Sequence, residues 1–231
     1  MVYNCIDNIL SVLYADHCDL CGAPARDTLC EGCRESLPFN HHHCRHCALP
    51  LPPGNPVPCC GRCSQSHWIE QSVIPLRYES PVDHLVGPFK FNGRLHHSRL
   101  LGDLLLEAVQ QAGGPLPEQL LPVPLHPTRL RQRGYNQSLE LARPLSRKLG
   151  ITLTHDSCIR VLDTRPQADL PRRQRLHNLR GAFRLSRPLE VDHVALVDDV
   201  VTTGSTVNEL ARLLHRAGVG RVDVWAVART P

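Results

Sequence analysis

The pattern of hydrophobic residues near the C-terminus predicts a strand, a helix and a second strand in succession. A continuous apolar run at residues 194–197 fits a strand that is buried on both faces. Apolar residues then recur at helical spacing over residues 207–217, Gly218 is a plausible helix stop, and a second apolar run covers residues 222–227. Open α/β sheets bind ligands at the carboxyl end of such strands, so we expect a ligand loop at residues 198–206.

Earlier segments predict further strands and helices of the same kind. Residues 73–78 and 121–125 read as strands. A helix should begin near His96 and end at the Gly-Gly-Pro break of residues 113–115, and another should run over residues 139–149. The expected fold is an α/β protein, with a parallel sheet flanked by helices.

The predicted loop carries acids and hydroxyl groups that suit a ribose 5-phosphate. Free backbone N–H groups at a helix start attract phosphate, and Gly204 lets the backbone approach it closely. The preceding Asp198 and Asp199 would hold sugar hydroxyls, directly or through a magnesium ion. The side chains that add hydroxyl donors are Thr202, Thr203, Ser205 and Thr206.

The alternative interpretation of this stretch is an ordinary capped helix start with two solvated acids. The whole string in a βαβ setting favours the ligand loop. The chain has neither a GxxxxGK[ST] nor a GxGxxG motif, which argues against a P-loop NTPase or a dinucleotide-binding fold.

Two further segments are strongly basic. Residues 129–133 hold three arginines before Gly134, and we expect a cationic loop that suits a diphosphate, although a solvated basic turn would have the same composition. Residues 172–180 fit three interpretations: a mobile lid, a helix face that meets nucleic acid, or a solvated helix. The side chains concerned there are Arg172, Arg173, Arg175 and Asn178.

Length and composition fit one substantial domain and a small one. The chain has 231 residues, 42% hydrophobic and 4% aromatic, with a net charge of +4. Its apolar runs fall short of the roughly 18 residues of a membrane span, so we expect no membrane insertion. Residues 1–14 lack a basic start and a small-residue cleavage site, so they read as a short docking helix rather than a signal peptide.

Most of the eleven cysteines stand in four CxxC pairs within the first 63 residues. Two such pairs close one tetrahedral zinc site, so we expect two structural zinc ions in a reducing cytoplasm. Sequential and crossed pairing are both open, and the short spacing between the first two pairs favours the sequential form. Cys59 competes with Cys60 as a ligand. The histidines at residues 41–43 could also substitute, though we favour a solvated turn there. Cys5 and Cys158 stand alone and are expected to be buried or inert. The predicted ligands are Cys18, Cys21, Cys30, Cys33, Cys44, Cys47, Cys60 and Cys63.

The acid pair and the loop after it resemble the phosphoribosyl-pyrophosphate (PRPP) loop of type I phosphoribosyltransferases. With the other motifs, the chain resembles the ComF/ComFC family, a double zinc ribbon joined to a phosphoribosyltransferase-like domain. We place the ribbons at residues 1–68 and the second domain at residues 69–231. The other motifs are the four CxxC pairs, Lys90-Phe-Asn-Gly93, Pro122-Val-Pro124, Arg133-Gly-Tyr-Asn-Gln137, Gln167, Arg175 with Asn178, and Gly181-Ala-Phe183.

This resemblance implies roles for particular residues. Asp198 and Asp199 would hold the ribose hydroxyls, and residues 202–206 would cradle the 5-phosphate. Arg133, with Arg129 or Arg131, would hold the pyrophosphate together with magnesium. Lys90 and Arg175 would act as outer clamps. The resemblance also implies a cytoplasmic protein that handles incoming single-stranded DNA in natural transformation, alongside DNA-uptake or recombination proteins.

Two hypotheses about function therefore stand. In one, the chain binds PRPP or a related ligand and acts in DNA uptake. In the other, it is an active phosphoribosyltransferase of nucleotide salvage with no DNA role, although neither a general base nor a base-recognition hood is identifiable. PRPP turnover and DNA binding across a salt series discriminate them.

Overall fold

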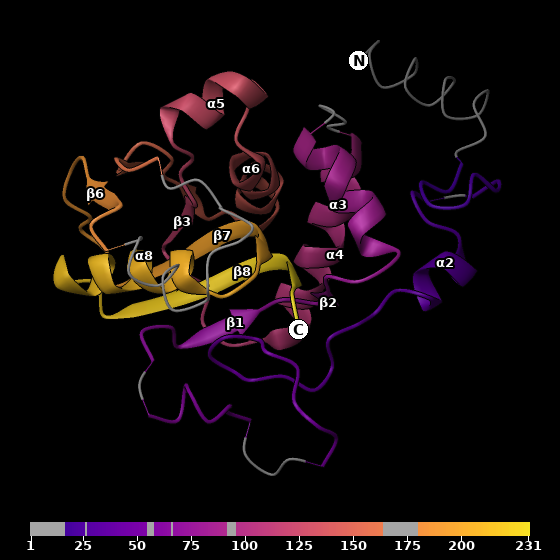
Figure 1. The fold of residues 1–231 in the computed structure, drawn as a ribbon, viewed down its shortest axis with the longest axis horizontal. Coiled ribbons are helices and arrows are strands. Elements are labelled where there is room, and N and C mark those ends of the chain that lie inside the picture. Colours follow the sequence, from indigo (N-terminus) through magenta and orange to yellow (C-terminus); the bar gives the residue numbers. More distant parts are fainter. Residues whose placement is uncertain (1–16, 26, 55–57, 66, 92–95, 164–179) are drawn as a thin grey trace.

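A parallel β-sheet forms the centre of the protein (Figure 1). The computed structural model describes residues 17–231 except residues 26, 55–57, 66, 92–95 and 164–179. The strand order is β1-β8-β7-β3-β4, and β2 pairs with β8 beyond the end of β1. Every pairing within this sheet is parallel. Its strands are β1 (Gln71–Val73), β2 (Leu76–Arg77), β3 (Gln119–Pro122), β4 (Thr152–Leu153), β7 (His193–Val201) and β8 (Arg221–Arg229).

Helices cover both faces of the sheet. Within the described residues, no helix is both long and apolar enough to cross a membrane. A separate antiparallel ribbon consists of β5 (Cys158–Arg160) and β6 (Phe183–Leu185). The helices are α2 (Glu31–Glu35), α3 (Val82–Phe91), α4 (His96–Ala112), α5 (Pro127–Arg133), α6 (Gln137–Leu149) and α8 (Ser205–Arg216).

The alternation of side chains along β7 divides the core between the two faces. Val194 and Leu196 pack in the cluster that contains α8, whereas Ala195 and Val197 pack in the cluster that contains α4 and α6. All four residues are fully buried. A strand that is apolar on both faces needs helices on both sides, and the α/β class predicted from the sequence is confirmed.

Several predicted boundaries differ from the structure. The predicted strand at 194–197 continues to Val201, because it stays paired with β8 beyond that run. The predicted strand at 73–78 is divided between β1 and β2. Helix α4 begins and ends where the sequence indicated, but α3, just before it, was not expected.

The cysteine-rich N-terminal segment packs against both faces of the sheet. Phe39 forms an antiparallel bridge with Leu76 of β2. Leu29 and Leu37 join the core on the α4 side, whereas Ala48 and Ile69 join the core on the α8 side. This segment therefore shares its apolar interior with the sheet.

A buried charged network at the start of β7 and β8 should stabilise the sheet. Asp223 accepts a hydrogen bond from His193 Nε2 at 2.9 Å and from Arg221 Nη2 at 3.0 Å. Asp223→Ala should lower the free energy of unfolding by about 2–4 kcal/mol, because it leaves buried donors unpaired. Urea unfolding measures this loss. The control, Asp156→Ala, removes an exposed ion pair with Arg187 and should stay within about 1 kcal/mol of wild type. Equal losses in the two variants would contradict the assignment.

Candidate functional site

The acid pair lies inside the last part of β7, not after its end as the sequence suggested. Strand β3 stops at Pro122, opposite Val197, so its pairing with β7 ends just before Asp198. On that open edge, Asp198 Oδ1 accepts hydrogen bonds from Ser138 Oγ at 3.0 Å and from the Asp199 amide at 2.9 Å. Asp199 is 8% exposed. Ser138 holds the first carboxylate in place, and sequence analysis missed it.

The loop after β7 folds tightly into the start of α8. Gly204 has φ of +75° and is the N-cap residue, a left-handed conformation that favours glycine. A Cβ on Gly204 would lie 3.4 Å from Asn208 Nδ2. Thr203 Oγ1 lies 2.7 Å from Ser205 Oγ and accepts from the Ser205 amide. Ser205 and Thr206 belong to the first turn of α8, not to the turn before it as expected.

This loop encloses a cavity of about 30 Å³ between Asp198 and Val207. Backbone N–H groups of the first turn of a helix have no partners within the helix, and they favour an anion. Helix α8 has 12 residues, so its aligned peptide dipoles add to that preference. The free N–H groups of this helix start would favour an anion beside the two carboxylates, and we call residues 202–206 the anion loop.

The first basic segment is a helix and not the predicted cationic loop. His126 caps α5, Pro127 occupies its first turn, and Gly134 ends it with φ of +81°. Asn136 then caps α6 through the Ser138 amide. The segment escaped prediction because a seven-residue helix is too short to show apolar periodicity.

The charge of Asp198 acts on an arginine of β5, which in turn interacts with an arginine of α5. Burial lowers the pKa of Arg160, as does the charge of Arg129, while Asp163 and Asp198 act in the opposite direction. Burial and the neighbouring Arg133 likewise lower the pKa of Arg129. Arg160, at the end of β5, therefore belongs to the same electrostatic environment as Asp198. A lone arginine in a short strand gave the sequence analysis no signal for it.

Several predicted residues lie outside the described side chains. The backbone of Lys90 lies in α3, but its side chain is not described. The second basic segment lies outside the described residues except for Arg180, and the assignment of its four candidates stays a prediction. They are Arg172, Arg173, Arg175 and Asn178.

The eight predicted cysteine ligands gather in two groups of four. The first group is Cys18, Cys21, Cys30 and Cys33, and the second is Cys44, Cys47, Cys60 and Cys63. Within each group all the sulfur atoms lie within 4.8 Å of one another. This is the sequential pairing, and neither group contains Cys59 or a histidine.

The sulfur spacing suits a zinc ion. Cys21 and Cys30 have their sulfur atoms 3.7 Å apart, as do Cys47 and Cys60. A zinc–sulfur bond of about 2.3 Å gives a tetrahedral edge of about 3.8 Å. The donors and their spacing therefore fit two structural zinc sites.

The acidity of the thiols also favours a cation. Although burial opposes ionisation of Cys18, backbone amides at Cys30 and Cys21 lower its pKa to about 6. In the same group, hydrogen bonding with Cys21 and Cys30 raises the pKa of Cys33 to about 12. Four thiolates close together repel one another, and a zinc ion compensates that charge. Burial raises the pKa of the isolated Cys158 to about 12, which makes it inert as expected.

A buried arginine joins the second cysteine group to the anion loop. Arg229 is 1% exposed, and its Nε donates to the Cys47 carbonyl at 2.9 Å. Its Nη1 donates to the carbonyls of Val201, at 3.2 Å, and Thr202. Arg62, beside Cys63, donates to the Thr203 carbonyl at 3.4 Å. The second cysteine group therefore supports the loop directly.

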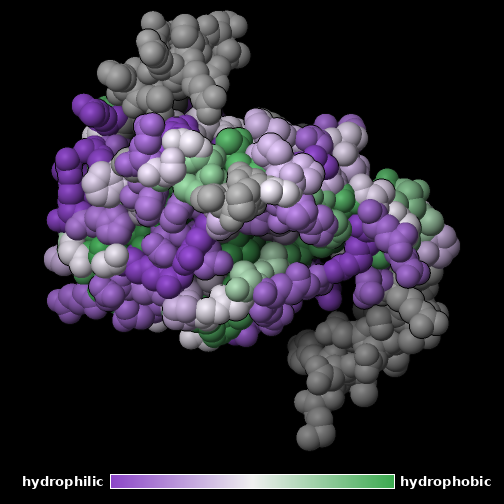
Figure 2. Space-filling view, turned by 90° about the horizontal axis from the view of Figure 1, so that it is seen from below, coloured by the Kyte–Doolittle hydropathy of each residue, from purple (hydrophilic) through white to green (hydrophobic). Residues whose placement is uncertain are grey.

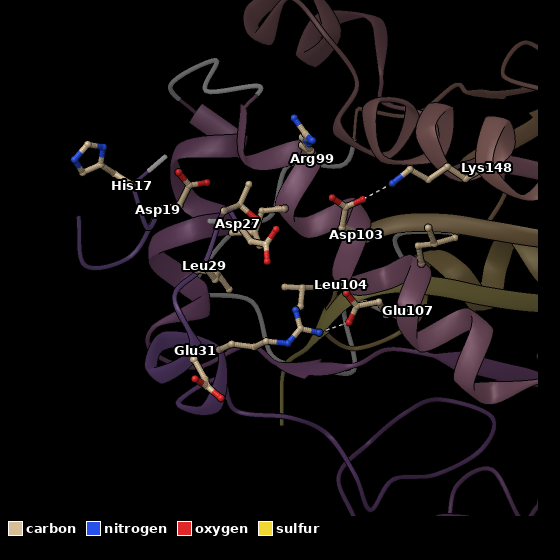
Figure 3. A pocket seen from close by; sticks show the side chains of 14 residues that line it. His17, Asp19, Asp27, Leu29, Glu31, Arg99, Asp103, Leu104, Glu107 and Lys148 are labelled. Atoms are coloured by element: carbon tan, nitrogen blue, oxygen red, sulfur yellow. Dashed lines mark hydrogen bonds and ion pairs between the residues drawn. The ribbon is translucent and has the colours of Figure 1, made fainter. Parts of the chain in front are cut away.

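A larger cavity than that of the anion loop lies elsewhere, beside the first cysteine group (Figure 3). It measures about 660 Å³ and lies between the segment around Asp19 and Asp27 and helix α4. Arg34 pairs with Glu107 at its wall, and Lys148 pairs with Asp103 at 2.6 Å. The first ion pair links α2, beside the first group, to α4, and the second links α4 to α6. None of the predicted ligand-loop residues lines the cavity.

Comparison with known proteins agrees with this arrangement of the two parts. A double zinc ribbon domain family matches residues 9–67, and a phosphoribosyl transferase domain family matches residues 136–231. A purine phosphoribosyltransferase from Pyrococcus horikoshii aligns at 17% identity and a TM-score of 0.35, covering 58% of this chain and 82% of its own. A TM-score this low carries no fold assignment, which rests instead on the sheet topology and on the two matching domain families. The class is thus a double zinc ribbon joined to a phosphoribosyltransferase-like domain.

Relatives over nearly the whole chain define the family. DNA utilization protein YhgH of Salmonella typhi is 39% identical over 221 residues, 92% of this chain and 96% of its own length. Competence protein F of Haemophilus influenzae is 37% identical over 214 residues, 89% of this chain and 92% of its own. The chain belongs to the ComF/ComFC family.

Metal analysis tests the cysteine groups. The purified chain should hold about two zinc ions, because each group of four thiolates takes one. Cys60→Ser should reduce this to about one, whereas Cys59→Ser should leave it unchanged, because the Cys59 sulfur lies outside both groups. Elemental analysis of anaerobically prepared protein measures the content. A loss of zinc in the Cys59 variant would overturn the ligand assignment.

Hydrogen exchange tests the support of the anion loop. Replacing Cys44 and Cys47 with serine should raise amide exchange over residues 200–206, because the Cys47 carbonyl would no longer hold Arg229 in place. The matched control replaces Cys21 and Cys33 in the first group and should leave that exchange unchanged. Equal exchange in the two variants would show that the loop does not depend on the second group.

Proposed function

We propose that this protein binds PRPP or a related phosphoribosyl ligand, with magnesium, at the carboxyl edge of β7. The observation that carries the proposal is the acid pair on β7 directly before a hydroxyl-rich anion cradle at a helix start. A ligand with a hydroxylated ring and a phosphate satisfies both halves of this site. A phosphate alone would be repelled by the two carboxylates.

Each group at the site has a role in this proposal. Asp198 and Asp199 hold the ribose hydroxyls, and their oxygens suit magnesium. The cradle of Thr202, Thr203, Gly204, Ser205 and Thr206 takes the 5-phosphate through its N–H groups and hydroxyls. The N–H groups cost little reorganisation, because hydrogen bonds between Thr203 and Ser205 hold the loop in shape.

The pyrophosphate lies on the arginine side of the acid pair. Arg133 holds it, and Arg129 and Arg160 add positive charge from α5 and β5. Magnesium bound to the pyrophosphate offsets the remaining charge and supplies electrostatic stabilisation when a bond to the pyrophosphate breaks. Lys90 is proposed as an outer clamp.

The biological setting of the proposal is DNA uptake and natural transformation in the cytoplasm. Its support is the names of the relatives, which refer to DNA utilization and competence. Reduced cysteines in two metal-suited groups fit that compartment. The ligand site would then serve a protein that handles incoming single-stranded DNA and works with uptake or recombination proteins.

Isothermal titration calorimetry with PRPP and magnesium tests the ligand site. Asp198→Asn/Asp199→Asn should weaken binding by at least about tenfold, because the amides keep the shape but lose the charge. Gly204→Val should also block binding, since valine strains the positive φ and crowds Asn208. The control is Asp192→Asn. Asp192 directly precedes β7, at the end of the strand away from the acid pair, so this variant should bind PRPP with wild-type affinity. Unchanged affinity in the double variant would refute the site.

The same ligand serves the second candidate, an active phosphoribosyltransferase of nucleotide salvage with no DNA role. Pyrophosphate release from PRPP in the presence of candidate bases measures that activity. Turnover that needs Asp198 and Asp199, combined with no affinity for single-stranded DNA, would favour the enzyme. Ligand binding without turnover, combined with DNA binding, would favour the DNA-uptake proposal.

A further inference from the structure

A groove runs beside the anion loop, between the second cysteine group and α8. It consists of two cavities, of about 410 and 340 Å³, and the side chain of Trp68 lines both. We call it the Trp68 groove. The first cavity includes Thr203 and Ser205 of the anion loop, so the groove adjoins the proposed ligand site. Its other principal side chains are Arg62, Arg180, Arg212, His215 and Arg221.

The charge along the groove beside the loop is positive. Arg62, Arg180 and Arg212 line it, and Glu209 is the acid among them. Arg212 donates to both carboxylate oxygens of Glu209, at 2.6 and 3.1 Å, and the Gly181 amide donates to one of them at 3.0 Å. Since Arg212 compensates Glu209, the charges of Arg62 and Arg180 set the sign of the potential.

Trp68 is a large aromatic side chain that remains 44% exposed at the junction of the two cavities. His215 fixes this point of the chain, because its Nε2 lies 2.8 Å from the Trp68 carbonyl oxygen and its ring centroid lies 6.0 Å from the indole. The only other tryptophan of the chain, Trp225, is buried in the core. A positioned indole with an accessible face is a platform for a flat ring.

Polar groups dominate the surface on this side of the molecule. Figure 2, which views the side where residues 44–68 lie in Figure 1, shows mainly hydrophilic atoms with small apolar patches. A charged ligand that also offers a flat apolar face fits such a surface better than an apolar peptide does.

We propose that the Trp68 groove binds single-stranded DNA, with phosphates against Arg62 and Arg180 and one base stacked on Trp68. Arginines that follow a backbone, combined with an aromatic platform, are the usual means of binding a single strand without sequence preference. A duplex does not fit this chemistry, because its bases stack on one another and offer no free face. The inference rests on the proposed role in handling DNA and gives that role a location.

Tryptophan fluorescence tests the stacking contact in the full chain. Titration with a short oligothymidylate should quench the emission of wild type, because Trp68 is the exposed one of two tryptophans. Trp68→Phe should retain most of the affinity, measured by anisotropy of a labelled oligonucleotide, and should lose the quenching. Trp68→Ala should weaken binding by about tenfold, the usual cost of losing one stacked base. Wild-type affinity in the Trp68→Ala variant would contradict the proposal that a base stacks on Trp68.

A salt series tests the arginines. Arg62→Gln/Arg180→Gln should reduce the slope of log affinity against log salt by about 1.4, because each phosphate contact on a single strand contributes about 0.7. The matched control, Arg99→Gln/Arg147→Gln, removes the same charge from α4 and α6 on the opposite face of the sheet and should leave the slope unchanged. Equal slopes in the two variants would contradict the proposal that Arg62 and Arg180 contact DNA phosphates.

The outcomes separate this inference from the proposed function. If wild type binds the oligonucleotide and the groove variants bind equally well, the Trp68 groove is not the DNA-binding site, but the proposed role in handling DNA stands. If wild type fails to bind single-stranded DNA, the DNA role and the groove both fall. Tighter binding of the matched RNA strand would overturn the assignment to DNA. PRPP calorimetry on the Arg62 variant shows whether the anion loop, whose Thr203 carbonyl this arginine holds, is still intact.

Discussion

Arg229 places a guanidinium in the interior, where its charge must be compensated by hydrogen bonds. Its partners include main-chain carbonyls from three separate parts of the chain: Cys47, the end of β7 at Val201 and Thr202, and Thr230. Moving a charge out of water is costly unless such partners are already in place. The side chain is therefore well placed only when the second cysteine group, β7 and β8 are all in their native positions.

This constraint ties the second cysteine group to the proposed ligand site. A small segment with few large apolar residues would draw its folding energy from metal, so we expect the position of the Cys47 carbonyl to depend on metal as well. The first group is tied elsewhere, because Arg34 of α2 pairs with Glu107 of α4. The two groups thus brace opposite faces of one sheet, and only the second contacts the anion loop through the bonds described.

The electrostatics of the site explain its proposed selectivity. Two carboxylates on β7 stand next to a helix start that favours anions, and the charge of Asp198 acts on Arg160 of β5, which interacts with Arg129 of α5. Each charge alone would favour a different partner. Together they fit a ligand that presents hydroxyls to the acids and phosphates to the loop and the arginines. The Trp68 groove extends the positive side of this arrangement beyond the loop.

Local sequence was sufficient for features whose chemistry lies within one segment. The run at residues 194–206 specified a buried strand, an acid pair and a helix start, because periodicity and capping act over neighbouring residues. The four CxxC pairs specified two metal-suited groups, since each pair closes locally. The short helix α5 was not predicted from the sequence. Its start at Pro127 and its end at Gly134 depend on single residues and not on a repeating hydrophobic pattern.

Only the tertiary structure decided which distant residues meet. It selected the sequential grouping of the cysteines and excluded Cys59 from both groups. It placed Arg160 near Asp198, and Arg62 and Trp68 beside a loop about 140 residues later in the chain. The physical reason is that hydrophobic periodicity reports which face of an element is buried, while the pairing of faces depends on the packing of the whole sheet. Sequence therefore determined the βαβ ligand loop and the cysteine pairs, and packing determined what surrounds them.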